Sequence, residues 1–419
     1  MPRVRSAYLR VCLAFLLVAS LPAGSPLARS DSWRGLSVQT VRPGQSIQAA
    51  IDRAAKGGAV FVWPGVYRET ANATNGLEIT KAIRLIGLST PTKRVVLENS
   101  GSQSNGIVVV PEDRTACLSC HQSLAPPFPV YSSVERGLKM RDPMIEDITI
   151  RGITIASFSN NGLFTENVDG FSIVDVESID NKNYGIFPTL SKNGVISRSR
   201  VTGSLDSGVW VETSENVSVT NTLVEGNVVG IEVSNSDNIL LARNESRNNS
   251  IGIGVFLLPF LFDDRPGAKR IAVEKNSVHH NNRPNDATPG TLLSEIPSGV
   301  GIILMGADRS RIAGNRIERN GLVGVALVDH CIATNGGPHD CTTHPTITPE
   351  FLADQEATNN RVEGNLLIRN GTNPPPHPFA FAASDLALLS AGTGNCFRKN
   401  TFRTSFSILG SLPPCRAER

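Results

Sequence analysis

The feature that most constrains the fold is a repeat of 22 or 23 residues along the middle of the chain. Each period is marked by a glycine followed by Ile, Leu or Val. These glycines are Gly162, Gly185, Gly208, Gly230 and Gly252, and the pattern returns at Gly301 and Gly324. Short runs rich in β-branched residues, punctuated by turn residues, predict strands. The chain of 419 residues is therefore expected to form one repeat array instead of two or three separate domains.

A second repeated element is an asparagine that closes a short strand of alternating apolar residues. Its members are Asn221, Asn244, Asn276, Asn315, Asn365 and Asn400, and a further Asn follows at Asn227, Asn249, Asn281, Asn320 and Asn370. Asparagine accepts left-handed backbone conformations, and its amide can hydrogen-bond to identical side chains stacked at the strand spacing of about 4.8 Å. The period and the turn residues predict an all-β protein, a parallel β-helix with one coil per repeat. The leucine ladder of leucine-rich repeats is missing, and a propeller would need a period about twice as long.

The start of the array is expected to be closed by a short helix. Ser46–Ala55 has Ser46 as a candidate N-cap and an apolar stripe at Ile47, Ala50, Ile51 and Ala54. A first strand follows at 59–67. Because the end of a repeat stack exposes its core, this helix would cover the N-terminal end.

The Val41–Glu69 opening, followed by Gly-Ile/Val and Asn-turn coils, resembles the right-handed parallel β-helix proteins of the pectin-lyase-like superfamily. The resemblance implies a single-stranded right-handed parallel β-helix over residues 38–415. Loop insertions are expected at 111–145, 256–269, 283–297 and 329–357. The superfamily includes lyases, hydrolases, epimerases, adhesins and non-enzymatic periplasmic proteins, so the resemblance specifies the fold and leaves the activity open.

The interior of the β-helix is predicted from the alternation of side chains along each strand. The expected inward residues are Ile186, Val209, Val211, Ile231, Val233, Ile253, Val255, Ile302, Leu304, Val325 and Leu327. Their neighbours in sequence would point outward.

The N-terminus is typical of a secretory signal peptide, residues 1–28. Arg3, Arg5 and Arg10 precede an apolar run at 11–20, and small residues follow at 23–25. The mature protein is therefore expected to be secreted or periplasmic, without stable membrane insertion. Lys+Arg total 40 against 38 Asp+Glu, a net charge of +2, which argues against nucleic acid as a partner.

Outward positions on the same strands predict a polysaccharide-binding face. The substrate-binding residues of this hypothesis are Phe164, Phe187, Trp210 and Glu166, because sugars stack on aromatic rings on successive coils. The catalytic candidates beside them are Glu212, Glu232, Asp263, Asp264, Asp329 and His330. Such carboxylates could bind Ca²⁺ for a lyase, or act as acid and base in a glycoside hydrolase or an epimerase.

Two alternatives stay open for this face. Inserted loops could cover the rings, which would then form a small additional core. The protein could also be a non-enzymatic adhesion or scaffold module, or a periplasmic assembly factor similar to the β-helix protein of nitrous-oxide-reductase maturation. An enzyme needs a cluster of carboxylates at the base of an open cleft, and this requirement separates the two classes.

The cysteines outside the signal peptide number six, which suggests disulfides in an oxidising compartment. Proximity in sequence favours Cys331–Cys341 and Cys396–Cys415. A Cys117–Cys120 bridge is expected as well, so no cofactor is expected. The segment Cys117-Leu118-Ser119-Cys120-His121 also matches the Cys-x-x-Cys-His attachment signature of c-type haem, which is the alternative for this loop.

Overall fold

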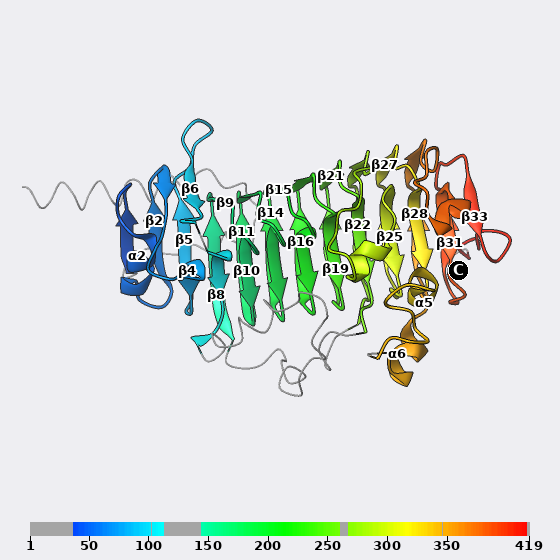
Figure 1. Cartoon of the computed structure of the whole chain (residues 1–419), viewed down its shortest axis with the longest axis horizontal. Coiled ribbons are helices and arrows are strands. Elements are labelled where there is room, and N and C mark those ends of the chain that lie inside the picture. The colour runs from blue at the N-terminus through cyan, green and yellow to red at the C-terminus, as the bar shows by residue number, and fades with distance from the viewer. Residues whose placement is uncertain (1–36, 102, 113–143, 260–266, 346, 417–419) are drawn as a thin grey trace, which may run out of the picture. The chain divides into compact units, whose positions relative to one another are not determined.

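The computed structural model describes residues 37–101, 103–112, 144–259, 267–345 and 347–416. Val38–Arg419 form one compact unit. Its described part is a stack of coils built from three parallel sheets, a right-handed parallel β-helix (Figure 1). The fold class expected from the repeat is confirmed.

Each sheet collects one strand from every coil, and successive coils pair in parallel along the stack. The first sheet contains β1 (Val38–Val41), β2 (Gly58–Val62), β5 (Ile83–Gly87), β8 (Ile145–Arg151), β11 (Val168–Val174), β14 (Lys192–Ser197), β17 (Glu215–Thr220), β20 (Leu240–Ala242), β23 (Ala272–Glu274), β26 (Arg311–Ala313), β29 (Arg361–Glu363) and β32 (Cys396–Arg398). The second contains β3 (Gly65–Tyr67), β6 (Val95–Glu98), β9 (Thr154–Ala156), β12 (Glu177–Ile179), β15 (Arg200–Thr202), β18 (Leu223–Glu225), β21 (Glu245–Arg247), β24 (Ser277–His279), β27 (Arg316–Glu318) and β30 (Leu366–Ile368).

The third sheet carries the Gly-Ile/Val repeat and positions the candidate site. Its strands are β4 (Asn75–Ile79), β7 (Asn105–Val109), β10 (Leu163–Glu166), β13 (Ile186–Thr189), β16 (Ser207–Glu212), β19 (Val229–Ser234), β22 (Ile251–Phe256), β25 (Val300–Met305), β28 (Val323–Val328), β31 (Ser384–Leu389) and β33 (Ser405–Ser407). We call it the Gly-Ile sheet. The predicted inward residues on its strands are all buried, from Ile186 on β13 to Leu327 on β28.

The repeated asparagines form hydrogen-bonded ladders between coils. In one ladder the amide of Asn227 donates to Asn249, which donates to Asn281, Asn281 to Asn320 and Asn320 to Asn370, with N···O distances of 3.0–3.1 Å. Each side-chain oxygen also accepts the backbone N–H of the ladder residue one coil earlier, as Asn281 does for Asn249 at 3.1 Å. Because these groups are buried, every rung satisfies polar atoms that would otherwise be costly.

The structure corrects the explanation for the turns. The left-handed residue is the one that precedes the ladder asparagine, such as Arg243 (φ 56°), Lys275 (φ 55°) and Arg319 (φ 52°). Asn221 is itself the left-handed turn residue of its coil (φ 50°), with Thr222 in the ladder position after it, whereas the other repeated asparagines have no positive φ. Their selection therefore comes from amide hydrogen bonding, while the turn conformation is adopted by residues of several types.

The N-terminal end is covered by α2 (Ile47–Arg53), within the range expected from the sequence. Ser46 is its N-cap and accepts the N–H of Ala49 at 3.0 Å. The carboxylate of Glu69 adds to the cap, because it accepts the Ile47 N–H at 2.6 Å and the Ser46 hydroxyl at 2.7 Å. An anion at this end also interacts favourably with the helix dipole.

Short helices outside the coils are α4 (Leu292–Glu295), α5 (His330–Ala333), α6 (Pro349–Asp354) and the 3₁₀ helix η3 (Pro378–Ala382). Both expected short-range disulfides are present, Cys331–Cys341 and Cys396–Cys415. Cys117, Cys120 and His121 lie outside the described residues, as does the proposed signal peptide. Within the described part of the chain, no helix has the length and apolar character needed to cross a membrane.

Candidate functional site

The outward columns of the Gly-Ile sheet have the register expected from the repeat. Phe164 pairs with Phe187, and Trp210 pairs with Glu232 on the next coil. In the second column Glu166 pairs with Thr189, which pairs with Glu212. The aromatic and acidic candidates therefore do gather on one face of consecutive coils.

The aromatic side chains of this face are buried, which corrects the expectation of an exposed sugar-binding track. Phe164, Phe187 and Trp210 are 1%, 3% and 8% exposed. Phe187 stacks on Trp210 with centroids 4.3 Å apart, and Tyr184 lies 4.7 Å from Trp210. Aromatic pairs at these distances stabilise one another. The rings thus form the small additional core that was the alternative reading of the sequence.

The carboxylates beside the rings are buried as well. Glu166, Glu212 and Glu232 are 0%, 1% and 3% exposed. The hydroxyls of Thr189 and Thr213 donate to Glu212. A buried carboxyl group needs such partners, because desolvation makes its charged form costly.

Glu232 is the centre of a hydrogen-bond network. It accepts the hydroxyls of Ser207 and Ser234, the latter at 2.8 Å, and the Trp210 indole N–H donates to Ser234 at 3.1 Å. The same Ser207 hydroxyl lies 3.1 Å from a carboxyl oxygen of the half-buried Asp206. One serine hydroxyl therefore lies between two carboxyl groups.

The electrostatics of this network favour protonated carboxyl groups. Burial raises the pKa of Glu212 to about 7, although hydrogen bonds from Thr189 and Thr213 oppose the shift. Burial likewise raises the pKa of Glu232 to about 7, against hydrogen bonds from Ser207 and Ser234. Burial, followed by repulsion from Glu232, raises the pKa of Asp206 well above its usual range, although Tyr184 donates a hydrogen bond to it.

Asp206, Ser207 and Tyr184 were missed by sequence reasoning. Asp206 and Tyr184 lie just before β16 and β13, and Ser207 is the first residue of β16 with the parity of the inward Val209, so none of the three is at an outward position that the alternation rule singles out. Their place relative to the repeat glycines was the only available signal. A polar residue at a turn is too common to single out.

The outer face of the Gly-Ile sheet becomes apolar toward the C-terminus. Phe256, Ile303, Met305 and Val328 pack there under Leu292 and Leu293 of α4. Next to them lies an apolar cavity lined by residues such as Val300, Ala326, Leu389 and Phe379. No carboxylate is among the residues that line this cavity. It therefore lacks the acid and base groups of a glycan-processing cleft.

Asp329 and His330 are buried in the structure and do not line an open groove. The two carboxylate oxygens of Asp329 accept the backbone N–H groups of Ala357, at 3.0 Å, and Ala391, at 2.8 Å. The His330 ring lies 2.9 Å from the Leu257 carbonyl oxygen, and burial lowers its pKa to about 4. Both residues thus anchor the inserted loop at 329–357 to the coils. The other two catalytic candidates, Asp263 and Asp264, lie outside the described residues.

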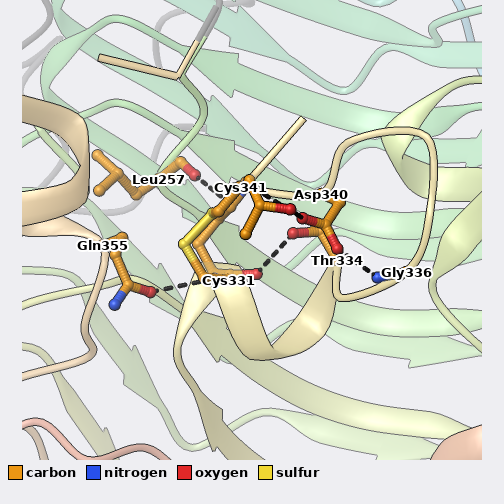
Figure 2. Close-up of a disulfide and its surroundings, with 9 residues drawn as sticks. Leu257, Cys331, Thr334, Gly336, Asp340, Cys341 and Gln355 are labelled. Atoms are coloured by element: carbon orange, nitrogen blue, oxygen red, sulfur yellow. Dashed lines mark hydrogen bonds between the residues drawn. A yellow bond between two sulfur atoms is a disulfide. The ribbon is translucent and has the colours of Figure 1, made fainter. Parts of the chain in front are cut away.

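The Cys331–Cys341 disulfide fastens the same loop (Figure 2). Its surroundings are held by backbone contacts: the Cys331 N–H donates to the Gln355 side chain at 3.0 Å, and the Gly336 N–H donates to Asp340 at 2.6 Å. Figure 2 shows these hydrogen bonds beside the disulfide. The disulfide and the hydrogen bonds together tie the loop to itself and to Gln355.

Two histidines of this loop, His339 and His344, lie beside Glu295 and are possible metal donors. His339 contacts the Glu295 carboxylate, and His344 stacks on His339 with centroids 4.9 Å apart and ring planes 25° apart. Stacked rings present faces to each other, whereas a metal ion needs nitrogen lone pairs that converge. Among the residues that the structure describes, no group of three or more His, Cys, Asp or Glu side chains is arranged to hold a metal ion.

Comparison with known proteins gives one family. The family model described as "Periplasmic copper-binding protein (NosD)" matches residues 144–408, more than half of the chain. No curated protein matches the sequence.

Solved structures similar to this chain are β-helix proteins of low sequence identity. The A-module of the mannuronan C-5 epimerase AlgE4 from Azotobacter vinelandii has a TM-score of 0.54 and 16% identity, over 86% of this chain and 94% of that one. A mutant DFA-IIIase from Arthrobacter chlorophenolicus A6 has a TM-score of 0.49 and 13% identity, over 91% and 82% of the two chains. Identities this low show a shared fold alone.

Proposed function

The chain belongs to the NosD family, and on that premise we propose that it is a non-enzymatic periplasmic protein that serves as a rigid binding scaffold in protein assembly. The family is periplasmic, which confirms the expected location outside the cytoplasm. A stack of hydrogen-bonded coils suits a scaffold, because its long surface keeps a fixed shape.

One observation carries the proposal: the acidic and aromatic face of the Gly-Ile sheet is closed. Glu212 and Glu232 are at most 3% exposed, and both accept hydrogen bonds from hydroxyls of the chain itself. A glycan would have to displace Phe187 from Trp210 before it could stack on either ring. A cleft with carboxylates at its base, which an enzyme of this fold requires, is not formed by the described residues around these candidates.

The family description names copper, which would need several donor side chains close together. Glu295, His339 and His344 are the nearest approach to a site, and their contacts are a carboxylate–imidazole pair and a ring stack. The described residues thus do not fit a three-ligand copper site. The proposed scaffold function accordingly involves no copper-dependent step at Glu295, His339 or His344.

A second candidate function is supported by the Asp206, Ser207 and Glu232 group. The carboxyl groups of Asp206 and Glu232 both lie beside the Ser207 hydroxyl, and both have raised pKa values. Tyr184 donates a hydrogen bond to Asp206. Carboxyl groups of this kind can exchange protons near neutral pH. Asp206 is half-buried, so this group is the most accessible part of the acidic network. A polysaccharide lyase, glycoside hydrolase or epimerase would use these residues.

The two functions are separated by a glycan screen with the purified mature protein. Uronate-containing and neutral polysaccharides are incubated with the protein, and products are followed by absorbance of unsaturated uronates and by released reducing ends. We expect neither product nor binding, and no difference between the wild type and Trp210→Ala. Product that is lost in Glu232→Gln but kept in Glu225→Gln, a change in an exposed ion pair with Arg200, would overturn the scaffold proposal in favour of an enzyme.

A further inference from the structure

The C-terminal end of the β-helix exposes large apolar side chains. Phe381, Phe402, Ile408 and Leu409 are 62%, 40%, 45% and 54% exposed. They lie on η3 and on the last coil, which includes β32 and β33, where the stack ends (Figure 1). Together with the exposed cations Lys399, Arg403 and Arg416 we call them the C-terminal end surface.

The apolar part of this surface is connected through a chain of rings. Phe379 at the mouth of the apolar cavity lies 6.2 Å from Phe381, and Phe381 lies 5.3 Å from Phe406 on β33. The exposed Ile408 and Leu409 follow β33 directly, at a turn. Contiguous exposed apolar surface of this kind marks a binding site more often than scattered single residues do.

The charge of this end is one-sided. Residues 364–416 contain the cations Arg369, Arg398, Lys399, Arg403 and Arg416, and their only carboxylate is Asp385. Asp385 is 1% exposed and accepts hydrogen bonds from Asn370 and from the backbone of Arg403. Arg398 is paired with Glu363, which leaves Lys399, Arg403 and Arg416 as exposed cations on the last coil. Over these residues the exposed charge is entirely positive.

We propose that the C-terminal end surface docks on an anionic phospholipid membrane. Apolar side chains that enter the boundary between headgroups and acyl chains, flanked by Lys and Arg beside anionic headgroups, are the combination that binds membrane surfaces. A second copy of this chain is a poorer occupant, because two such ends would bring the same cations face to face. This inference goes beyond the scaffold function and gives the β-helix one anchored end.

The experiment is co-sedimentation of the full mature protein with vesicles of phosphatidylcholine alone or of phosphatidylcholine and phosphatidylglycerol in equal parts. We expect sedimentation with the anionic vesicles at low salt, little with the neutral ones, and loss at high salt. Each charge near the surface is worth roughly a fivefold change in partition, so Arg403→Glu, which changes the charge by two, should lower it roughly 25-fold. Phe381→Ser with Leu409→Ser should abolish binding at the same salt concentration.

Val66→Ser is the matched control. Val66 is an apolar residue 52% exposed on β3, the first strand of the second sheet, and it is not part of the C-terminal end surface. The control variant should bind vesicles as the wild type does, and the melting temperatures of all variants should confirm that they are folded. The proposal is overturned if the anionic vesicles do not sediment the wild type, or if the Phe381 and Leu409 variant binds as well as the Val66 control. It is also overturned if sedimentation velocity shows a dimer that the same variant abolishes, since a second copy would then occupy the surface.

Discussion

Glu212→Gln should stabilise the protein at alkaline pH and destabilise it slightly at acidic pH. Burial raises the pKa of Glu212 from its ordinary 4.5 to about 7. In the unfolded chain the group ionises near its ordinary value. The folded state therefore keeps a proton that the unfolded state has already lost, and stability contributed by this group is complete below pH 4.5 and is lost as the pH rises to about 7.

The magnitude follows from that shift. The difference between the pKa values of Glu212 in the folded and unfolded states corresponds to about 3 kcal/mol of lost unfolding free energy at pH 8, since each pKa unit is worth about 1.4 kcal/mol. Gln cannot ionise, and it fits the same space between Thr189 and Thr213. The hydroxyls of these threonines can turn to accept from the amide, so we allow about 1 kcal/mol for a poorer hydrogen bond. The net expectation is a gain of about 2 kcal/mol at pH 8 and a loss of about 1 kcal/mol at pH 4.5.

The assay is urea unfolding at both pH values, followed by tryptophan fluorescence. Trp210 lies on the same coil as Glu212 and should respond when this part of the stack unfolds. Glu225→Gln is the control with the opposite sign: hydrogen bonds and charge from Arg200 and Arg247 lower the pKa of Glu225, so its removal should cost stability at pH 8, and this cost should shrink only as the pH falls below 4.5. If Glu212→Gln loses the same free energy of unfolding at both pH values, the assignment of a buried, proton-holding carboxyl is refuted.

Three further changes test other parts of the molecule. Ile231→Asp should cost several kcal/mol and lower the melting temperature measured by circular dichroism, because it buries an unpaired charge in the aliphatic stack. Asn281→Ala should cost about 2–4 kcal/mol in the same assay, since it leaves the amide and backbone N–H of Asn249 without their acceptor. The loop around His330 should become less protected from hydrogen exchange as the pH falls from 6.5 toward 4, because the buried ring is held neutral beside Leu257 and acquires a proton on unfolding; His330→Gln should remove that dependence.

The coil and its register were predictable because they are repeated. Alternation of side chains along a strand places every second residue on one face, and the glycine spacing aligns one coil with the next. The pairs Phe164 with Phe187 and Glu166 with Thr189 follow from these two rules alone. The asparagine ladder was predictable for the same reason, although its left-handed residue is the preceding one.

The closure of the outer face was not predictable, because it depends on contacts that have no period. The position of Leu292 over Met305 or of Phe379 beside Val300 follows from loops of irregular length. The buried state of Asp329 depends likewise on Ala357 and Ala391, which are distant in sequence. A sequence shows which residues point outward from a strand, and it does not show what then covers them.

The closed face also indicates where the exposed chemistry of this β-helix remains. An outward column that repeats on every coil would form a long groove if it were open, and this chain fills it with Phe187, Trp210 and hydroxyl-bound carboxyl groups. Filling it packs the rings of neighbouring coils against one another and buries Glu212 and Glu232. Large exposed apolar side chains occur instead on the last described coil, where Phe402 and Leu409 are 40% and 54% exposed. On the two proposals made above, this β-helix interacts through its ends and inserted loops more readily than through its repeated faces.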